Sequence, residues 1–248
     1  METPLSTYLA LETSESYTSV ALLRSDNKLF VRESCEHNDH AVVLDVMIQD
    51  VLAEAGLTFN DLTAVGISQG PGSYTGLRIG YATIKGICFA TSLPMIAVPT
   101  LAALAGKIER LAKLDPTADN YCCVPMIDAR RMEVYTQTFR PGLHAETDAY
   151  ACILEERLPV RPEGLHAYYG GSGAEKAQQV LDPAHWTFVE TPVVRASDLL
   201  DILQARYLSG LFEDLAYSEP LYVKEFEATP STRTPFRAPV PAAESGAK

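Results

Sequence analysis

The glycines of residues 69–80, QGPGSYTGLRIG, form the segment of this sequence best suited to binding chemistry. A glycine-rich turn at a helix N-terminus exposes backbone N–H groups and the positive end of the helix dipole, which together attract phosphate. The segment lacks the GxxxxGK(S/T) pattern of nucleotide-binding loops, and Lys85 lies too far along the chain to act as its lysine. A packing or turn role is therefore favoured, with phosphate binding as the alternative.

Other residues that could do chemistry are scattered along the chain. The five histidines form no ligand-like cluster: His37, His40, His144, His166 and His185. Capping or exposure to solvent is the favoured role for the first two, which precede a predicted helix. Ser73 does not lie in a GxSxG nucleophile elbow. Asp128 and Arg130 could form a catalytic pair, but a turn-stabilising ion pair or a partner contact is favoured.

The elements before the glycine-rich segment are predicted to be mostly strands. Short β-prone runs at residues 7–11, 18–23 and 28–34 predict three consecutive antiparallel strands. A buried strand at residues 62–68 leads directly into the glycines, and residues 74–90 predict a helix after them. Interior glycines each cost a helix up to about 1 kcal/mol. We therefore expect the helix at 74–90 to pack closely on a neighbour.

A helix is also predicted at residues 40–55, with Asn38 or Asp39 as N-cap and Gly56 just past its end. Its core stripe is expected to contain Val43 or Leu44, Met47, Ile48, Val51, Leu52 and Ala55. The apolar side chains of Val42, Val46 and Ala53 fall on a different face, so the helix requires burial on two sides. Either another element of the chain covers the second side or a partner subunit does, and the subunit interface is favoured.

The chain is expected to form an N-terminal lobe, residues 1–115, and a C-terminal lobe, residues 116–228. A turn-rich boundary at 114–120 separates them, and a helix near 197–210 is expected to complete the first lobe. Residues 229–248 are rich in Pro, Ala and Ser, which predicts a disordered tail. No internal repeat of 20 to 50 residues is evident.

The formal net charge of −12 argues against direct nucleic-acid binding, since phosphate-binding surfaces are usually basic. No apolar run is long enough to span a membrane, and nothing charged precedes an apolar run at the N-terminus, so we expect a soluble protein. The 5 cysteines show no metal-type CxxC spacing. Buried thiols are therefore expected at Cys122 and Cys123, in keeping with a reducing, cytoplasmic location.

Several segments together resemble the TsaB (YeaZ) family of tRNA threonylcarbamoyladenosine biosynthesis proteins. The most specific is GPGSYTGLRIG at residues 70–80, which matches the family signature without a mismatch. The others are ALETS at 10–14, DLTAVGIS at 61–68, LPMIAVPTLAALA at 93–105, MIDARRMEVY at 126–135 and PLYVKEF at 220–226. Three positions depart from the family pattern: Glu12 stands where aspartate is usual, Met132 where glycine is usual and Lys224 where arginine is common.

The resemblance implies an α/β, two-lobed fold of the actin, sugar kinase and Hsp70 type (ASKHA), with mixed sheets and flanking helices. It also implies a non-catalytic scaffolding or activating subunit that pairs with TsaD, its catalytic paralogue, and is joined by the ATPase TsaE. A homodimer is expected where TsaD is absent. The expected interface lies on the first two helices: His40, Val42, Val43, Val46, Met47, Asp50, Gly72, Tyr74, Thr75, Leu77, Arg78, Tyr81 and Lys85.

The broader superfamily binds nucleotide, and the matching positions here are the candidates for vestigial contacts: Glu12, Thr13, Ser14, Gly170 and Gly171. We expect no metal and no cofactor in this chain alone, and ATP only at the level of the complex. TsaD holds its metal with an HxxxH pair, whereas the matching positions here are Thr100 and Leu104. The rival interpretation is an enzyme acting alone, either a metallopeptidase or a small-molecule kinase.

Overall fold

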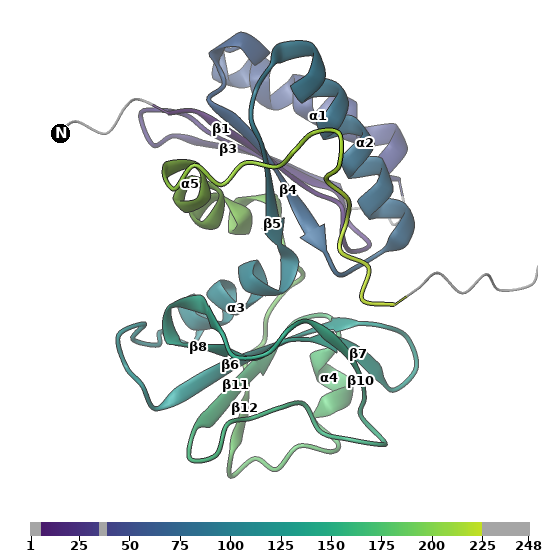
Figure 1. Ribbon diagram of the computed structural model, residues 1–248, viewed down its shortest axis with the longest axis vertical. Helices are drawn as coiled ribbons and strands as arrows, with labels where there is room; N and C mark the ends of the chain where they lie inside the picture. Colours follow the sequence, from purple (N-terminus) through teal and green to yellow (C-terminus); the bar gives the residue numbers. More distant parts are fainter. Residues whose placement is uncertain (1–5, 35–38, 225–248) are drawn as a thin grey trace, which may run out of the picture.

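The computed structural model describes residues 6–34 and 39–224, which fold into two lobes stacked along the long axis of the molecule (Figure 1). The predictions for Cys35, His37, Asn38 and the tail at 229–248 lie outside the described residues. Each lobe is built on one sheet.

The first lobe contains the five-stranded sheet β3-β2-β1-β4-β5. Its strands are β1 (Tyr8–Glu12), β2 (Ser19–Leu23), β3 (Leu29–Glu33), β4 (Ala64–Gly70) and β5 (Met95–Pro99). The first three pair antiparallel, as predicted, whereas β4 pairs parallel to both β1 and β5. The short helix η1 (Phe59–Asp61) precedes β4.

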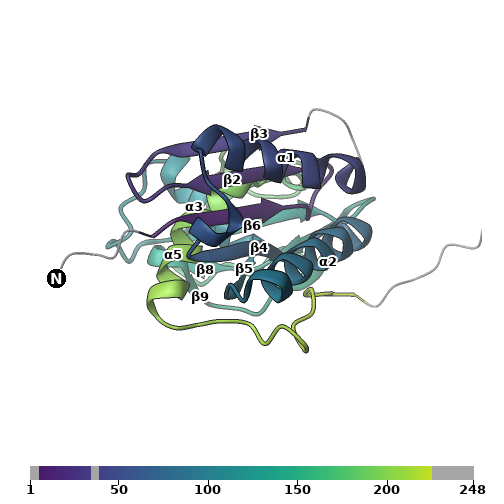
Figure 2. The same cartoon turned by 90° about the horizontal axis from the view of Figure 1, so that it is seen from above.

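Helices cover both faces of this sheet. Helices α1 (His40–Ala55) and α2 (Tyr74–Thr91) lie on one face (Figure 2), where they pack on alternate side chains such as Leu9 and Leu11. The other face packs against η3 (Ala196–Leu199) and α5 (Leu200–Leu208), which the chain reaches only after the second lobe. Gly66 of β4 allows this approach, because a Cβ there would lie 2.1 Å from Leu203 Cδ1.

The second lobe repeats the strand order of the first. In the seven-stranded sheet the main path is β10-β7-β6-β11-β12. These strands are β6 (Tyr121–Asp128), β7 (Glu133–Thr136), β10 (Tyr150–Ile153), β11 (His166–Gly170) and β12 (Trp186–Phe188). The first three pair antiparallel, and β11 pairs parallel to both β6 and β12. The repeated unit is therefore a whole lobe, which explains why no shorter repeat is evident in the sequence.

The remaining elements of the second lobe are short, apart from a helix between the lobes. They are β8 (Phe139–Arg140), η2 (Pro141–Leu143), β9 (His144–Ala145) and α4 (Ala174–Ala177). Helix α3 (Thr100–Leu111) lies between the two sheets and packs on β6 of the second lobe and on η3 of the first (Figure 1). Cys122 and Cys123 of β6 are fully buried, as predicted, and burial raises the pKa of the Cys122 thiol to about 11.

Residues 209–224, which we call the C-terminal strap, return across the first lobe after α5. The strap runs past the edge strand β5, descends beside α2 and ends between the lobes (Figures 1 and 2). Glu213 N donates to Met95 O at 2.9 Å, and Leu221 N donates to Gln69 O at 2.8 Å. At its end Lys224 forms an ion pair with Glu133 of β7 at 2.5 Å, which ties the strap to the second lobe.

Candidate functional site

Helix α1 presents one buried face and one exposed face. Its buried residues are Leu44, Met47, Ile48, Val51, Leu52 and Ala55, together with His40, which confirms the predicted core stripe. On the second face, Val42 is 76% exposed and Val46 is 59% exposed. No other element among the described residues covers these two valines, which does not support the interpretation that another element of the chain buries them.

Helix α2 packs against the β1–β2 turn at its glycines. A Cβ at Gly76 would lie 2.1 Å from the Thr13 carbonyl oxygen, and a Cβ at Gly80 would lie 2.3 Å from Thr13 Oγ1. Ser73 caps the helix by accepting a hydrogen bond from Gly76 N at 3.2 Å. The close packing predicted for this helix is thus confirmed, and the neighbour is the turn at Thr13.

The opposite side of α2 is open. Gly86 has no atom within 4 Å of its would-be Cβ, and Phe89 is 82% exposed. We define the α1–α2 face as the exposed residues Val42 and Val46 of α1 with Arg78, Ala82, Gly86 and Phe89 of α2. Phe89 was missed in the sequence analysis, although its spacing from Arg78, Ala82 and Lys85 places it in the same helical row.

Four residues expected at the partner interface are buried inside this chain instead: His40, Met47, Leu77 and Tyr81. Met47 and Tyr81 belong to the core between the two helices and the first sheet, and Leu77 is fully buried beside Gly70. Gly72 is half-buried, because it packs on Ser14. The remaining expected residues are exposed or half-buried: Val42, Val43, Val46, Asp50, Tyr74, Thr75, Arg78 and Lys85.

His40 has neither a capping role nor a solvent-exposed one. Its ring is 2% exposed, and Nδ1 lies 2.7 Å from the Thr18 hydroxyl oxygen. Gly76 of α2 approaches the other ring nitrogen closely. Burial lowers the pKa of His40, which keeps the ring neutral at physiological pH. The residue therefore joins α1 to the β1–β2 turn and α2.

A cleft of about 590 Å³ opens between the lobes. It is lined by the β1–β2 turn, the residues 71–75, the β6–β7 turn, Ser172 and the end of the strap. Among the candidate nucleotide contacts, Ser14 lines this cleft although it is 1% exposed, whereas Glu12 and Thr13 are buried and do not line it. Gly170 and Gly171 are also buried, since would-be Cβ atoms there would lie 2.3 Å from Thr191 Oγ1 and 2.5 Å from Met126 O. Glu12, Thr13, Gly170 and Gly171 are thus all closely packed in the described structure.

Glu12 is enclosed completely at the end of β1. Its Oε1 accepts hydrogen bonds from Ser14 N at 2.5 Å and from Ser68 Oγ at 3.0 Å. Burial raises the pKa of this carboxyl group from 4.5 to about 7, and the nearby Glu15 contributes in the same direction. Because the group is about half protonated near pH 7 and mostly protonated below it, it is a weaker cation ligand than an ordinary carboxylate.

The β6–β7 turn contains no Asp128–Arg130 ion pair. Asp128 instead pairs with Lys176 of α4 and accepts a backbone hydrogen bond from Arg130 N at 3.2 Å. The prediction of an ion pair between Asp128 and Arg130 is therefore wrong, because the cation that pairs with Asp128 is Lys176. Asp128 stabilises the turn through its backbone contact and joins the turn to α4.

The positions that correspond to the metal-binding pair have structural roles. Thr100 Oγ1 accepts a hydrogen bond from Gly70 N at 3.0 Å, and Leu104 is fully buried in the core around α3. Within residues 6–34 and 39–224, no group of three or more His, Cys, Asp and Glu side chains is placed to hold a metal ion. No helix in the same residues is long and apolar enough to cross a membrane.

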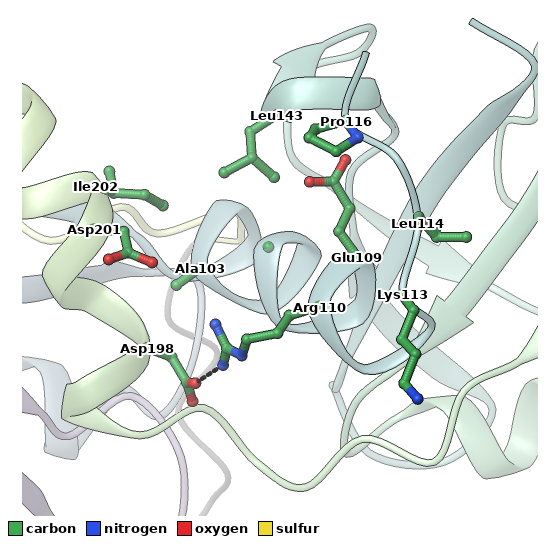
Figure 3. A pocket seen from close by; sticks show the side chains of 11 residues that line it. Ala103, Glu109, Arg110, Lys113, Leu114, Pro116, Leu143, Asp198, Asp201 and Ile202 are labelled. Carbon is green, nitrogen blue, oxygen red and sulfur yellow. Dashed lines mark hydrogen bonds and ion pairs between the residues drawn. The ribbon is translucent and has the colours of Figure 1, made fainter. Parts of the chain in front are cut away.

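A second depression, of about 470 Å³, lies beside α3 (Figure 3). One of its lining carboxylates, Asp198 of η3, accepts hydrogen bonds from Lys107 Nζ at 2.7 Å and from Arg110 at 2.6 Å. Another, Glu109, accepts from the Tyr121 hydroxyl at 3.0 Å. These charges stabilise the packing of α3 on both lobes. We therefore assign the depression no ligand.

The two lobes with the same strand order define a protein of the actin, sugar kinase and Hsp70 fold class. The family described as TsaD, tRNA N6-adenosine threonylcarbamoyltransferase, matches residues 34–218. The chain is 29% identical over 228 residues to the tRNA threonylcarbamoyladenosine biosynthesis protein TsaB of Haemophilus influenzae, covering 88% of this chain and 93% of that protein. The structure of YeaZ from Pseudomonas aeruginosa superposes with a TM-score of 0.75 at 28% identity, covering 88% of this chain and 99% of that one. The chain belongs to the TsaB (YeaZ) family.

The transferase itself is also similar to part of the chain. The tRNA N6-adenosine threonylcarbamoyltransferase of Streptococcus mutans is 33% identical over 122 residues, which cover 43% of this chain and 36% of the transferase. This likeness agrees with a paralogous relation between the two families.

Proposed function

We propose that this chain is a non-catalytic scaffolding subunit in tRNA threonylcarbamoyladenosine biosynthesis and that it pairs with a TsaD-type transferase through the α1–α2 face. The observation that carries the proposal is the exposure of Val42, Val46 and Phe89 on two adjacent helices. Burying a valine or phenylalanine side chain stabilises a complex by roughly 1.5 to 3 kcal/mol. Ala82 and Gly86 of α2 are also exposed, and these small residues would allow a partner helix to approach closely.

The chemistry of the described residues supports an accessory role. Thr100 and Leu104 do not supply the paired histidine ligands of a metal site, and the carboxyl group of Glu12 is buried with its pKa raised to about 7. The net charge of −12 disfavours tRNA binding by this chain, so the partner would hold the tRNA. We place any ATP requirement, and the joining of a TsaE-type ATPase, at the level of the complex.

The test of the proposal is binding of the purified chain to the TsaD-type transferase of the same organism. Val46→Arg is expected to weaken this binding at least 100-fold, because the charged side chain would have to be desolvated at the interface. Val160→Arg is the matched control, since Val160 is a valine of the second lobe that is 45% exposed. Calorimetric titration measures the affinities, and circular dichroism checks the fold of each variant.

The outcomes separate the proposal from its rivals. Failure of the wild-type chain to bind the transferase would overturn the pairing, as would full binding by Val46→Arg. The enzyme alternative requires ATP turnover or one bound metal ion per chain in the purified wild-type protein. A homodimer of the chain, formed through the same face, is expected when the transferase is absent.

A further inference from the structure

The C-terminal strap is held in place along α2. Leu221 N bonds to Gln69 O at the end of β4, and the ring of Tyr222 lies 4.9 Å from the ring of Tyr74 at the start of α2. Farther back, Leu215 packs on the core beneath α1 and α2. The strap is thus fixed against the same helix that provides most of the residues of the α1–α2 face.

The strap presents an exposed tyrosine from an ordered turn. Asp214 O accepts a hydrogen bond from Ser218 N at 2.8 Å, and Asp214 Oδ1 accepts from Ala216 N at 2.8 Å and from Tyr217 N at 3.3 Å. Tyr217 at the top of this turn is 84% exposed. Because the backbone is already ordered, a partner that buries this ring would lose little conformational entropy. Tyrosine is also among the residues enriched at energetically important interface positions.

The strap and the α1–α2 face are continuous. Residues 74, 78, 85 and 89 recur at helical spacing and share one side of α2. This row begins at Tyr74, which contacts Tyr222 of the strap, and ends at the exposed Phe89. Arg78 donates to the Tyr74 hydroxyl at 2.9 Å and lies 5.3 Å from its ring centroid, so it continues the aromatic contact onto α2.

The charges around this surface favour a partner that differs from the chain itself. Asp45 of α1 and Asp214 and Glu219 of the strap are exposed acidic residues. Arg32 pairs with Asp50 and Glu54, but no ion pair is seen for Asp45, Asp214 or Glu219 among the described side chains. A two-fold dimer through this surface would set the acidic margins of α1 and of the strap close to each other, which weakens it relative to a complex with a partner of basic margin. A protein with an apolar helical face and a basic margin would fit.

We propose that the strap extends the α1–α2 face and that Tyr217 contacts the same partner, a transferase subunit whose docking face is bordered by basic residues. This inference rests on the proposed function. It adds a contact outside the two helices. It also predicts that the heterodimer is more stable than the homodimer, because the acidic margin would face basic residues of the transferase.

The inference is tested with the wild-type chain, Tyr217→Ala and Phe212→Ala. Phe212 is a matched control because it is 50% exposed at the start of the strap and packs on Tyr207 of α5, away from the Tyr74 row. Tyr217→Ala is expected to weaken binding to the TsaD-type transferase at least 10-fold, and Phe212→Ala is expected to leave it within about 3-fold of wild type. Glu219→Lys should also weaken binding, most strongly at low salt.

The failures of the two proposals are distinguishable. If Val46→Arg abolishes binding while Tyr217→Ala binds like wild type, the strap contact is overturned and the helical pairing stands. If the wild-type chain does not bind the transferase at all, the proposed function itself fails. Self-association measured by sedimentation at low salt checks the charge argument, which is overturned if the homodimer is as tight as the heterodimer.

Discussion

Replacing Gly76 with alanine is expected to destabilise the protein by on the order of 3 kcal/mol, at the upper end of overpacking effects. The added methyl would lie 2.1 Å from the Thr13 carbonyl oxygen and 3.2 Å from His40 Nε2. The first contact involves backbone in a turn that also supports Gly80, so it cannot be relieved by rotation of one side chain. The gain in helix propensity, about 1 kcal/mol, is too small to offset this clash.

Gly86→Ala is the matched control for this prediction, because it makes the same change in the same helix. Its methyl would meet no atom within 4 Å, so the substitution is expected to stabilise the protein by up to about 1 kcal/mol. Denaturant unfolding of the three proteins measures the free energies. Equal effects of the two substitutions would contradict the packing described for α2 on the β1–β2 turn.

The second large effect is expected at Glu12, where stability should depend on pH. The pKa of the native carboxyl group is raised to about 7 from 4.5, so between these values the native state binds a proton that the unfolded state has lost. The associated stability is fully present below pH 4.5 and is lost as the pH rises through about 7. A shift of this size corresponds to roughly 3 kcal/mol.

Glu12→Gln removes this ionisation while it retains an oxygen that can accept from Ser14 N and Ser68 Oγ. The variant is expected to match the wild type near pH 4.5 and to be more stable by up to about 3 kcal/mol at pH 8. Glu15, whose pKa is also raised by burial, is present in both proteins, so the difference between them reports the titration of Glu12 together with its coupling to Glu15. A difference that stays constant from pH 4.5 to pH 8 would contradict the assignment.

Helical periodicity accounts for much of what could be predicted about the candidate interface. The apolar residues of α1 fall into two groups at different angles around the helix, and the structure buries one group and exposes Val42 and Val46. The glycines of α2 likewise predicted a close contact, because their cost in a free helix is offset only where a neighbour approaches. Both conclusions depend only on the spacing of apolar residues and glycines along a helix, which can be read directly from the sequence.

The neighbours of each face could not be predicted in the same way. Met47, Leu77 and Tyr81 have the same side-chain types as interface residues, but the first sheet and the β1–β2 turn enclose them. The ring of His40 is buried and hydrogen-bonded to Thr18. These two residues are 22 positions apart, so only the folded structure brings them together. The contact between Tyr222 and Tyr74 likewise joins residues far apart in the sequence.

The sequence by itself therefore determined the fold class, the family, the two-sided pattern of α1 and the acidic character that disfavours nucleic acid. Only the tertiary structure decided which helix residues remain at the surface, that Glu12 is enclosed and that the strap lies beside α2. The physical reason is that spacing along a strand or helix sets which side chains share a face. Which segment covers that face depends on contacts between residues distant in the chain.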